Sequence, residues 1–268
     1  MNYILDKLSS NPRVTIITVC FNSEKTIKDT IESVLSQDYK NIEYIVVDAD
    51  SSDETQNIIK QFEEKISLFI CEKDNGIYDG MNKGINNSTG EIIGILNSDD
   101  IYSSDKVISQ VVSRLKITNA STLYADLVFV KKDNLNKVMR YWKSGQFSIK
   151  KLKKGWMLPH PTLFVRKEVY ERFGLYNYEF KKSSDYEMVL RTLYKNNLTT
   201  TYLPKIIVKM RLGGVSNKNI INRFLANKED FSAWRCNLPY SPFMIRFVKP
   251  FAKIFQFFNR PKQKDYLN

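Results

Sequence analysis

Apolar and polar positions alternate in blocks along the first 115 residues, and each block has the period of a strand or of a helix. Four short runs are mostly apolar and rich in β-branched residues, which is typical of buried strands. These runs are VTIITVCF, IEYIVVDA, LFICE and EIIGILN. Apolar residues then recur every three or four positions after each run, which predicts amphipathic helices. This alternation predicts an α/β fold with a Rossmann-like, mostly parallel sheet and helices on both faces.

The second half of the chain has a less regular pattern. TLYADLVFV and KVMRYWK predict two strands around a turn, and PTLFVR predicts a strand followed by a short helix that ends at Gly174. KKSSDYEMVLRTLYKNN predicts a helix capped by Ser183 or Ser184. Strands around TTTYL and IIVKMRL follow, and a further helix is expected from about Asn217 to Trp234.

The C-terminal tail, residues 237–268, has a pattern of its own. From Phe243 to Phe258 the large apolar side chains fall on one side of a helix and the cationic side chains on the other. Pro250 should kink or split this helix, because it lacks the N–H that a continuous helix needs. Two hypotheses remain open for the tail. It packs on the core, or it lies in a membrane interface with its cations on anionic lipid.

Composition limits the class of protein. The chain has 268 residues, of which 43% are hydrophobic and 26% charged, as in soluble globular proteins. No run approaches the ~20 apolar residues of a membrane span, and the N-terminus lacks the pattern of a signal peptide. The three cysteines are widely spaced, which argues against a disulfide framework or zinc site and for a reducing compartment. We therefore expect a cytoplasmic protein.

The net charge of +12 indicates an anionic partner. Cationic residues are concentrated between Lys131 and Lys154 and again in the tail. Either run can also be an ordinary solvated face. A nucleic-acid-binding module is one interpretation of the charge, but neither an RNA-binding motif with interleaved aromatic residues nor a helix-turn-helix signature occurs. We therefore expect no nucleic-acid partner.

Polar residues directly follow two of the predicted strands. VVDADSSDET comes at the end of the second strand, and LNSDD at the end of the fourth. Ligands of parallel sheets bind outside the carboxyl ends of the strands, so this placement favours a ligand site. The adjacent carboxylates Asp99 and Asp100 form either a polar turn or a site for a hard cation. The Rossmann and P-loop glycine motifs are absent, which leaves a nucleotide held by acidic strand ends and a metal.

Four stretches together resemble the family 2 glycosyltransferases of the GT-A type, and specifically the branch that builds bacterial surface polysaccharides, such as O-antigen and colanic acid. They are VTIITVCFNSEKTIKDTIESVLSQDYKNIEYIVVDADSSDET, EKDNGIYDGMNKGINNSTGEIIGILNSDD, HPTLFVRKEVYERFG and SSDYEMVLR. The resemblance implies one GT-A domain over residues 1–236. It implies a nucleotide-sugar-binding half over residues 12–115 and an acceptor-binding, catalytic half over residues 120–215.

The resemblance also implies a set of nucleotide contacts. Asp48 matches the residue that accepts a hydrogen bond from the uracil ring, and Asp50 stands where relatives often have glycine. The DNGIYDGMNKG stretch, with Asp74 and Asn82, would run beneath the nucleotide, although Tyr78 and Met81 within it can equally be core residues. Asn97 would bond a ribose hydroxyl.

The remaining implied roles concern the metal and the proton. Asp99 would bind Mn²⁺ or Mg²⁺ together with the donor phosphates, supported by Asp100. Asp185 matches the base that takes the acceptor proton, with Glu187 as an alternative. His160, the only histidine of the chain, would contact the diphosphate or the acceptor, or else be structural.

The implied function is an inverting, metal-dependent transfer of sugar from a nucleotide-sugar, expected to be a UDP-sugar, to a hydroxyl of a lipid-linked saccharide. Such an enzyme would lie peripherally on the inner face of the cytoplasmic membrane and contact anionic lipid. An alternative within the same class is transfer onto a polyprenyl monophosphate. Asp185 would then be dispensable, because that acceptor is already ionised.

Overall fold

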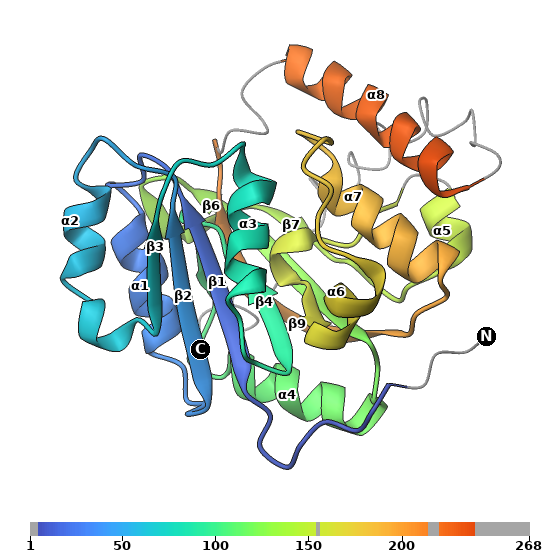
Figure 1. Cartoon of the computed structure of the whole chain (residues 1–268), viewed down its shortest axis with the longest axis horizontal. Helices are drawn as coiled ribbons and strands as arrows, with labels where there is room; N and C mark the ends of the chain where they lie inside the picture. The colour runs from blue at the N-terminus through green and yellow to red at the C-terminus, as the bar shows by residue number, and fades with distance from the viewer. Residues whose placement is uncertain (1–4, 154–155, 214–219, 239–268) are drawn as a thin grey trace.

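A computed structural model describes residues 5–153, 156–213 and 220–238 of the chain, and side chains of the last segment from residue 228 onward. The described residues form one mixed α/β unit around a sheet in the order β3-β2-β1-β4-β8-β6-β9-β5, with β7 paired to β6 (Figure 1). The expected α/β fold is confirmed. The predicted tail helix lies outside the described residues.

The first half of the sheet is parallel. It consists of β1 (Val14–Cys20), β2 (Ile42–Asp48), β3 (Leu68–Cys71) and β4 (Ile92–Ile95). In register, Cys20 of β1 lies beside Asp48 of β2, which lies beside Cys71 of β3. These strands therefore end at one edge, and the polar segments that follow them meet there.

The second half of the sheet mixes both directions. It consists of β5 (Asp100–Tyr102), β6 (Thr122–Lys131), β7 (Asn134–Trp142), β8 (Phe164–Arg166) and β9 (Thr200–Arg211). β8 is antiparallel to both β4 and β6, whereas β9 runs parallel to β6 and antiparallel to β5. The two strands expected around TTTYL and IIVKMRL form a single strand, β9, because its register with β6 continues across the intervening proline through a bulge.

Helices cover both faces of the sheet. On one face α1 (Ile27–Leu35), α2 (Thr55–Lys60) and α4 (Val107–Thr118) pack over a core that includes Ile31, Ile59 and Val111. On the other face α3 (Ile77–Asn86), α6 (Lys167–Phe173) and α7 (Ser184–Val189) bury Met81, Val169 and Tyr186. Here α3 lies so close to β1 that a Cβ on Gly84 would meet Ile17 Cγ2 at 2.4 Å.

Three further elements complete the second half. They are the short helix α5 (Ile149–Lys153), a π-helix (Leu190–Lys195) that continues α7, and α8 (Ile220–Asn237). α6 ends at Gly174, as predicted, and this glycine has a φ of 88°. Among the described helices, none combines the length and apolar character that a membrane crossing requires.

Candidate active site

The loops that follow β1, β2 and β4 are joined to one another by hydrogen bonds. The Asn22 N–H donates to Ser51 Oγ at 2.8 Å, and the Ser52 N–H donates to Asn22 Oδ1 at 3.0 Å. The hydroxyls of Ser23 and Ser98 lie 2.9 Å apart. The polar segments predicted at the strand ends thus form one continuous surface, and they belong to a single site.

Asp48 and Asp50 have different surroundings within this surface. The Asp48 side chain is fully buried, and its carboxylate accepts bonds from Ser51 N–H at 2.8 Å and Ser51 Oγ at 2.6 Å. Asp50 is exposed and has a φ of 63°, a left-handed conformation that Asp tolerates better than most residues. Asp48 therefore holds the shape of the loop, and Asp50 is the carboxylate that the loop presents.

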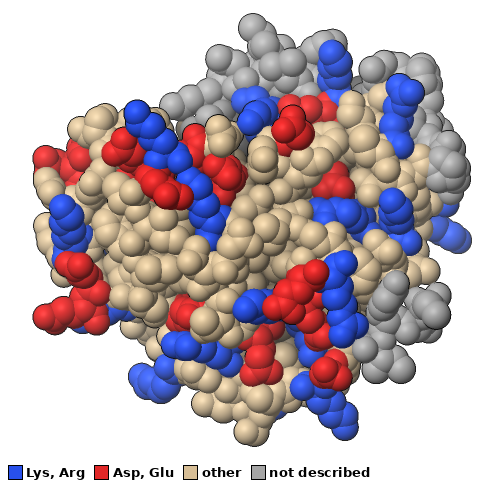
Figure 2. Space-filling view, in the orientation of Figure 1, with Lys and Arg blue, Asp and Glu red and all other residues tan. Residues whose placement is uncertain are grey.

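Asp74 lies in the loop that leads into α3, and Asn82 lies within α3. Asp74 Oδ1 accepts from the Gly76 N–H at 2.9 Å, and its other oxygen lies over Gly80 beside the end of β1. Asn82 is buried, and its amide forms two bonds with the Tyr176 backbone, at 2.7 Å to the carbonyl and 3.0 Å from the N–H. Asp74 therefore borders the site, whereas Asn82 ties α3 to the segment that follows α6. Figure 2 shows acidic side chains gathered over the start of α3.

Asn97 and Asp99 lie in the segment that joins β4 to β5, and Asp100 begins β5; the two carboxylates are largely desolvated. Burial and then the neighbouring Asp99 charge raise the pKa of Asp100 well above its ordinary value. Burial also raises the pKa of Asp99, although Arg211 and Lys132 oppose this effect. The Asn97 amide donates to Asp100 Oδ2 at 3.2 Å. These two carboxylates would gain most from a neighbouring positive charge.

Two oxygens of this cluster fit a hard cation. Asn97 Oδ1 and Asp100 Oδ1 are buried, and no hydrogen-bond donor in the described part of the chain reaches them. Nor do three or more His, Cys, Asp or Glu side chains converge on a metal position among those residues. Mg²⁺ and similar ions are characteristically held by one or two carboxylates together with substrate phosphates. The cluster therefore fits a metal whose remaining ligands come from a bound diphosphate.

Arg211, at the end of β9, supports the cluster from a strand that is distant in sequence. Its guanidinium donates to the Asp99 carbonyl at 2.9 Å and forms an ion pair with Asp29 of α1. The side chain is only 5% exposed. Sequence analysis did not identify Arg211, because nothing in the apolar pattern of its strand indicates that β9 passes beside β5.

Asp185 lies in the first turn of α7, where negative charge is favoured. Its Oδ1 accepts from the Tyr78 hydroxyl at 3.1 Å and from the Tyr186 N–H at 2.8 Å. Burial and the Asp185 charge raise the pKa of Tyr78 well above its ordinary value, so the phenol remains a donor. Tyr78 therefore packs in the core, as its spacing allowed, and also binds Asp185 through its hydroxyl.

His160 lies near Asp185 and Tyr78 and is half-buried. Its Nε2 is 2.8 Å from the Tyr176 hydroxyl, and the Tyr176 ring stacks on Tyr78 with centroids 5.7 Å apart. Burial lowers the pKa of His160, although Asp185 opposes the effect. The neutral imidazole therefore belongs to the polar network around Asp185.

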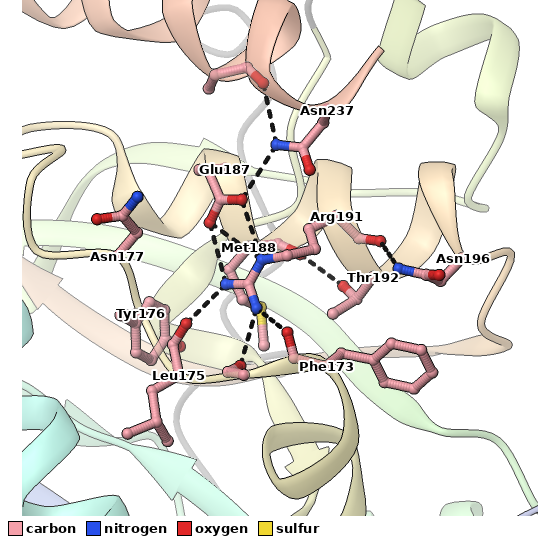
Figure 3. Close-up of polar contacts among 12 residues, drawn as sticks. Phe173, Leu175, Tyr176, Asn177, Glu187, Met188, Arg191, Thr192, Asn196 and Asn237 are labelled. Atoms are coloured by element: carbon pink, nitrogen blue, oxygen red, sulfur yellow. Dashed lines mark hydrogen bonds and ion pairs between the residues drawn. The ribbon is translucent and has the colours of Figure 1, made fainter.

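Glu187 is unsuited to the role of an alternative base. It is 5% exposed, and the Arg191 guanidinium binds it with Nε 3.0 Å from Oε1 and Nη2 3.0 Å from Oε2 (Figure 3). Arg191 also donates to the carbonyls of Phe173, Gly174 and Leu175. The Glu187 carboxylate is therefore committed to a buried ion pair that holds the end of α6 against α7.

An exposed aromatic side chain also borders the site. Phe21, directly after β1, is 61% exposed although it continues an apolar run. Nucleic-acid bases stack readily on such rings. Its position immediately before Asn22 at a predicted strand end was a signal that the sequence pattern alone could have provided.

Comparison with known proteins identifies the class. The family described as Glycosyl transferase family 2 matches residues 15–174. An uncharacterised glycosyltransferase of Mycobacterium tuberculosis is 30% identical over 186 residues, covering 69% of this chain and 70% of its own. The Escherichia coli UDP-Glc:alpha-D-GlcNAc-diphosphoundecaprenol beta-1,3-glucosyltransferase WfgD is 30% identical over 200 residues, covering 74% of this chain and 77% of its own.

Solved structures share the fold at low sequence identity. S. aureus TarS in complex with UDP-GlcNAc has a TM-score of 0.66 at 17% identity, covering 84% of this chain and 65% of its own. The mannosyltransferase PcManGT from Pyrobaculum calidifontis, in complex with GDP-Man and Mn²⁺, has a TM-score of 0.65 at 15% identity, covering 94% of this chain and 72% of its own. With the family match over residues 15–174, these comparisons establish that the chain belongs to glycosyltransferase family 2 and has a GT-A-type fold.

Proposed function

We propose that the protein transfers a sugar, with inversion, from a UDP-sugar to a hydroxyl of a lipid-linked saccharide during synthesis of a bacterial surface polysaccharide. The observation that carries the proposal is that the site has two distinct carboxylate groups, one single and one paired. One is the single carboxylate of Asp185, which accepts from Tyr78 and from the Tyr186 N–H at the start of α7. The desolvated pair Asp99 and Asp100 lies at the end of β4.

Asp185 acts as the general base in this proposal. Its carboxylate takes the proton of the acceptor hydroxyl while the oxygen attacks the anomeric carbon. The bond to the nucleoside diphosphate breaks on the opposite face of the sugar, so the configuration inverts. One base suffices for this single displacement, and the ion-paired Glu187 has no part in it.

The donor lies across the joined loops after β1, β2 and β4. Phe21 offers its ring to the base, and Asp50 and Asp74 offer acceptors to the base and ribose. Asn97 was expected at the ribose, but its one oxygen without a donor in the described chain lies in the metal cluster. Asp48 acts through Ser51 by shaping the loop. Asn82, which sequence analysis placed against the nucleotide, acts through the backbone of Tyr176. His160 lies at the acceptor side, in the network around Asp185.

Asp99 and Asp100, together with Asn97, would hold Mn²⁺ or Mg²⁺. When bound, the ion supplies positive charge to the departing diphosphate. Support comes from the two buried oxygens that lack donors within the described residues. The PcManGT structure, which has the same fold, is a complex with GDP-Man and Mn²⁺.

The acceptor class is supported by the name of the relative WfgD, which includes GlcNAc-diphosphoundecaprenol. An enzyme with a lipid-linked acceptor benefits from contact with an anionic membrane. The chain has no Asp or Glu between Asp133 and Glu168, and Lys143, Lys150 and Lys151 on this stretch are exposed. Figure 2 shows cationic side chains on the side of the molecule that carries α5. This surface and the basic tail support a peripheral membrane location.

Thermal denaturation with nucleotides tests the donor and metal assignments together. We expect UDP with Mn²⁺ or Mg²⁺ to raise the melting temperature and EDTA to remove most of the increase, because a ligand that binds only the folded state stabilises it. The matched comparison is Asp99→Asn, which should respond to UDP equally with and without metal. If the unaltered protein is stabilised equally by UDP in EDTA, the metal assignment is wrong.

A further inference from the structure

Helix α8 contacts the catalytic segment at three successive places. Glu229 Oε2 accepts from the Lys182 N–H at 2.7 Å, and the Trp234 indole N–H donates to the Tyr186 hydroxyl at 2.7 Å. The Asn237 amide donates to Glu187 Oε1 at 3.0 Å (Figure 3). These contacts lie on both sides of Asp185 in the sequence. They come from a helix outside residues 15–174, the part of the chain that the family pattern matches.

The contacts at the C-terminal end of α8 are buried. The Trp234 side chain is fully buried, and its ring packs edge-on against Tyr194 with centroids 5.4 Å apart. Asn237 is 7% exposed. Buried hydrogen bonds are costly to break, because the freed donor or acceptor cannot turn to water. α8 is therefore tightly attached to the helix that carries Asp185.

α7 needs external support to hold its first turn. It has six residues and then changes to a π-helix, and helices this short are unstable on their own. The Ser184 hydroxyl in that turn is buried with no partner in the described chain. Groups that hold the turn include Tyr78 of α3, which bonds Asp185 itself, and polar side chains of α8, which bond its neighbours.

We propose that α8 positions Asp185 for proton transfer, with Trp234 as the main positioning residue. The inference rests on the proposed role of Asp185 as base. Trp234 fixes the Tyr186 ring, whose backbone N–H bonds the Asp185 carboxylate. Asn237 holds the Glu187 carboxylate in place. Glu187 is ion-paired with Arg191, which donates to the backbone carbonyls that precede Tyr176. Asp185 is thus bonded directly by Tyr78 of α3 and supported through its sequence neighbours by α8. Misplacement of either support reduces turnover without changing donor binding.

Trp234→Phe removes the indole donor and keeps an aromatic ring. We expect turnover to fall about 2–10-fold, the equivalent of one net hydrogen bond, with an unchanged KM for the donor. Amide hydrogen exchange should become faster in residues 182–189 but not in the loop at 97–102. Ser232→Ala is the matched control, because among the described residues that hydroxyl donates only to the Lys228 carbonyl within α8. It should leave turnover and exchange unchanged.

Two further variants make the test specific. Tyr186→Phe breaks the same bond, so the double variant should lose no more turnover than either single variant. Asn237→Ala tests the same inference without creating a cavity beneath Tyr194, if Trp234→Phe does not fold. If the folded α8 variants keep wild-type turnover and exchange while Asp185→Asn is inactive, the role of α8 is wrong and the base assignment stands. Wild-type turnover in Asp185→Asn would instead overturn the base assignment on which the inference rests.

Discussion

Asp185 and Glu187 lie two residues apart at the start of α7, yet their surroundings give them different chemistry. Glu187 is nearly fully buried in an ion pair with Arg191, so its proton-accepting oxygens are occupied. Asp185 is half-buried and accepts from Tyr78 and Tyr186 through one oxygen, Oδ1. Of these two carboxylates, Asp185 is therefore the one that combines a fixed orientation with partial exposure, as the proposed base requires.

We expect Asp185→Asn to lower turnover about 10²–10⁴-fold, the usual contribution of a general base. Donor binding should stay nearly intact, because the amide keeps the size and the acceptor oxygen of the side chain. Steady-state kinetics with a hydroxyl acceptor, and thermal shift with UDP and Mn²⁺, measure the two quantities separately.

Glu187→Gln is the matched control. It should lower the melting temperature, because it leaves a buried Arg191 without its counter-charge, and lower turnover less than Asp185→Asn does. Near-normal turnover in Asp185→Asn would contradict the base role and favour an acceptor that is already ionised, such as a polyprenyl phosphate.

At the scale of elements, Glu43 secures the sheet at the end opposite the site. It lies near the start of β2 and is 6% exposed. Its carboxylate accepts from Thr15 Oγ1 of β1 at 2.6 Å and from the Thr89 N–H and hydroxyl, both at 2.7 Å. Burial alone would raise the pKa of Glu43, but these hydrogen bonds outweigh it and the pKa is lowered. The charged form is therefore the one that stabilises the fold.

The lowered pKa predicts a direction for the pH dependence of stability. The contribution of Glu43 is present above its ordinary pKa of 4.5 and is lost as the pH falls through the lower value in the folded state. We expect Glu43→Gln to reduce the free energy of unfolding by roughly 1–2 kcal/mol at pH 7. The deficit should shrink below about pH 4.5.

Urea denaturation across pH measures this difference. The exposed Glu63 provides the control, and Glu63→Gln should follow the wild-type curve at every pH. A deficit in Glu43→Gln that is the same at pH 3.5 and pH 7 would mean that packing, and not charge, accounts for it.

At the scale of the whole molecule, the expected membrane contact depends on the basic tail. The described helix α8 ends at Asn237, so truncation after Tyr240 keeps every contact that α8 makes with α7. We expect weak, salt-sensitive binding of the full chain to anionic liposomes, because lysine and arginine are attracted to anionic lipid over a short, screened range. This binding should be lost in the truncated protein.

Cosedimentation with anionic and with neutral liposomes measures this binding, and circular dichroism checks that the truncated protein is folded. If the truncated protein unfolds, the tail is part of the core. If it stays folded and binds anionic liposomes as well as the full chain does, the tail is not the membrane contact.

The periodicity of the chain by itself determined β1 to β4, α1 to α4 and the edge at which polar residues gather. This was possible because β1 to β4 are mostly apolar and polar residues follow soon after each of them. The sequence also identified Asp185 at a helix start, since capping residues precede it. Such features depend on neighbours in sequence, and local pattern is sufficient to predict them.

Tertiary structure alone decided which polar atoms remain available. Asp48 and Asn82 match positions of a nucleotide site, but Ser51 and the Tyr176 backbone occupy their polar atoms. Arg211 reaches Asp99 across a separation of 112 residues, and Trp234 reaches Tyr186 across 48. Hydrogen-bond partners so distant in sequence leave no periodic signal, because the pairing depends on how strands and helices pack and not on the residues beside them.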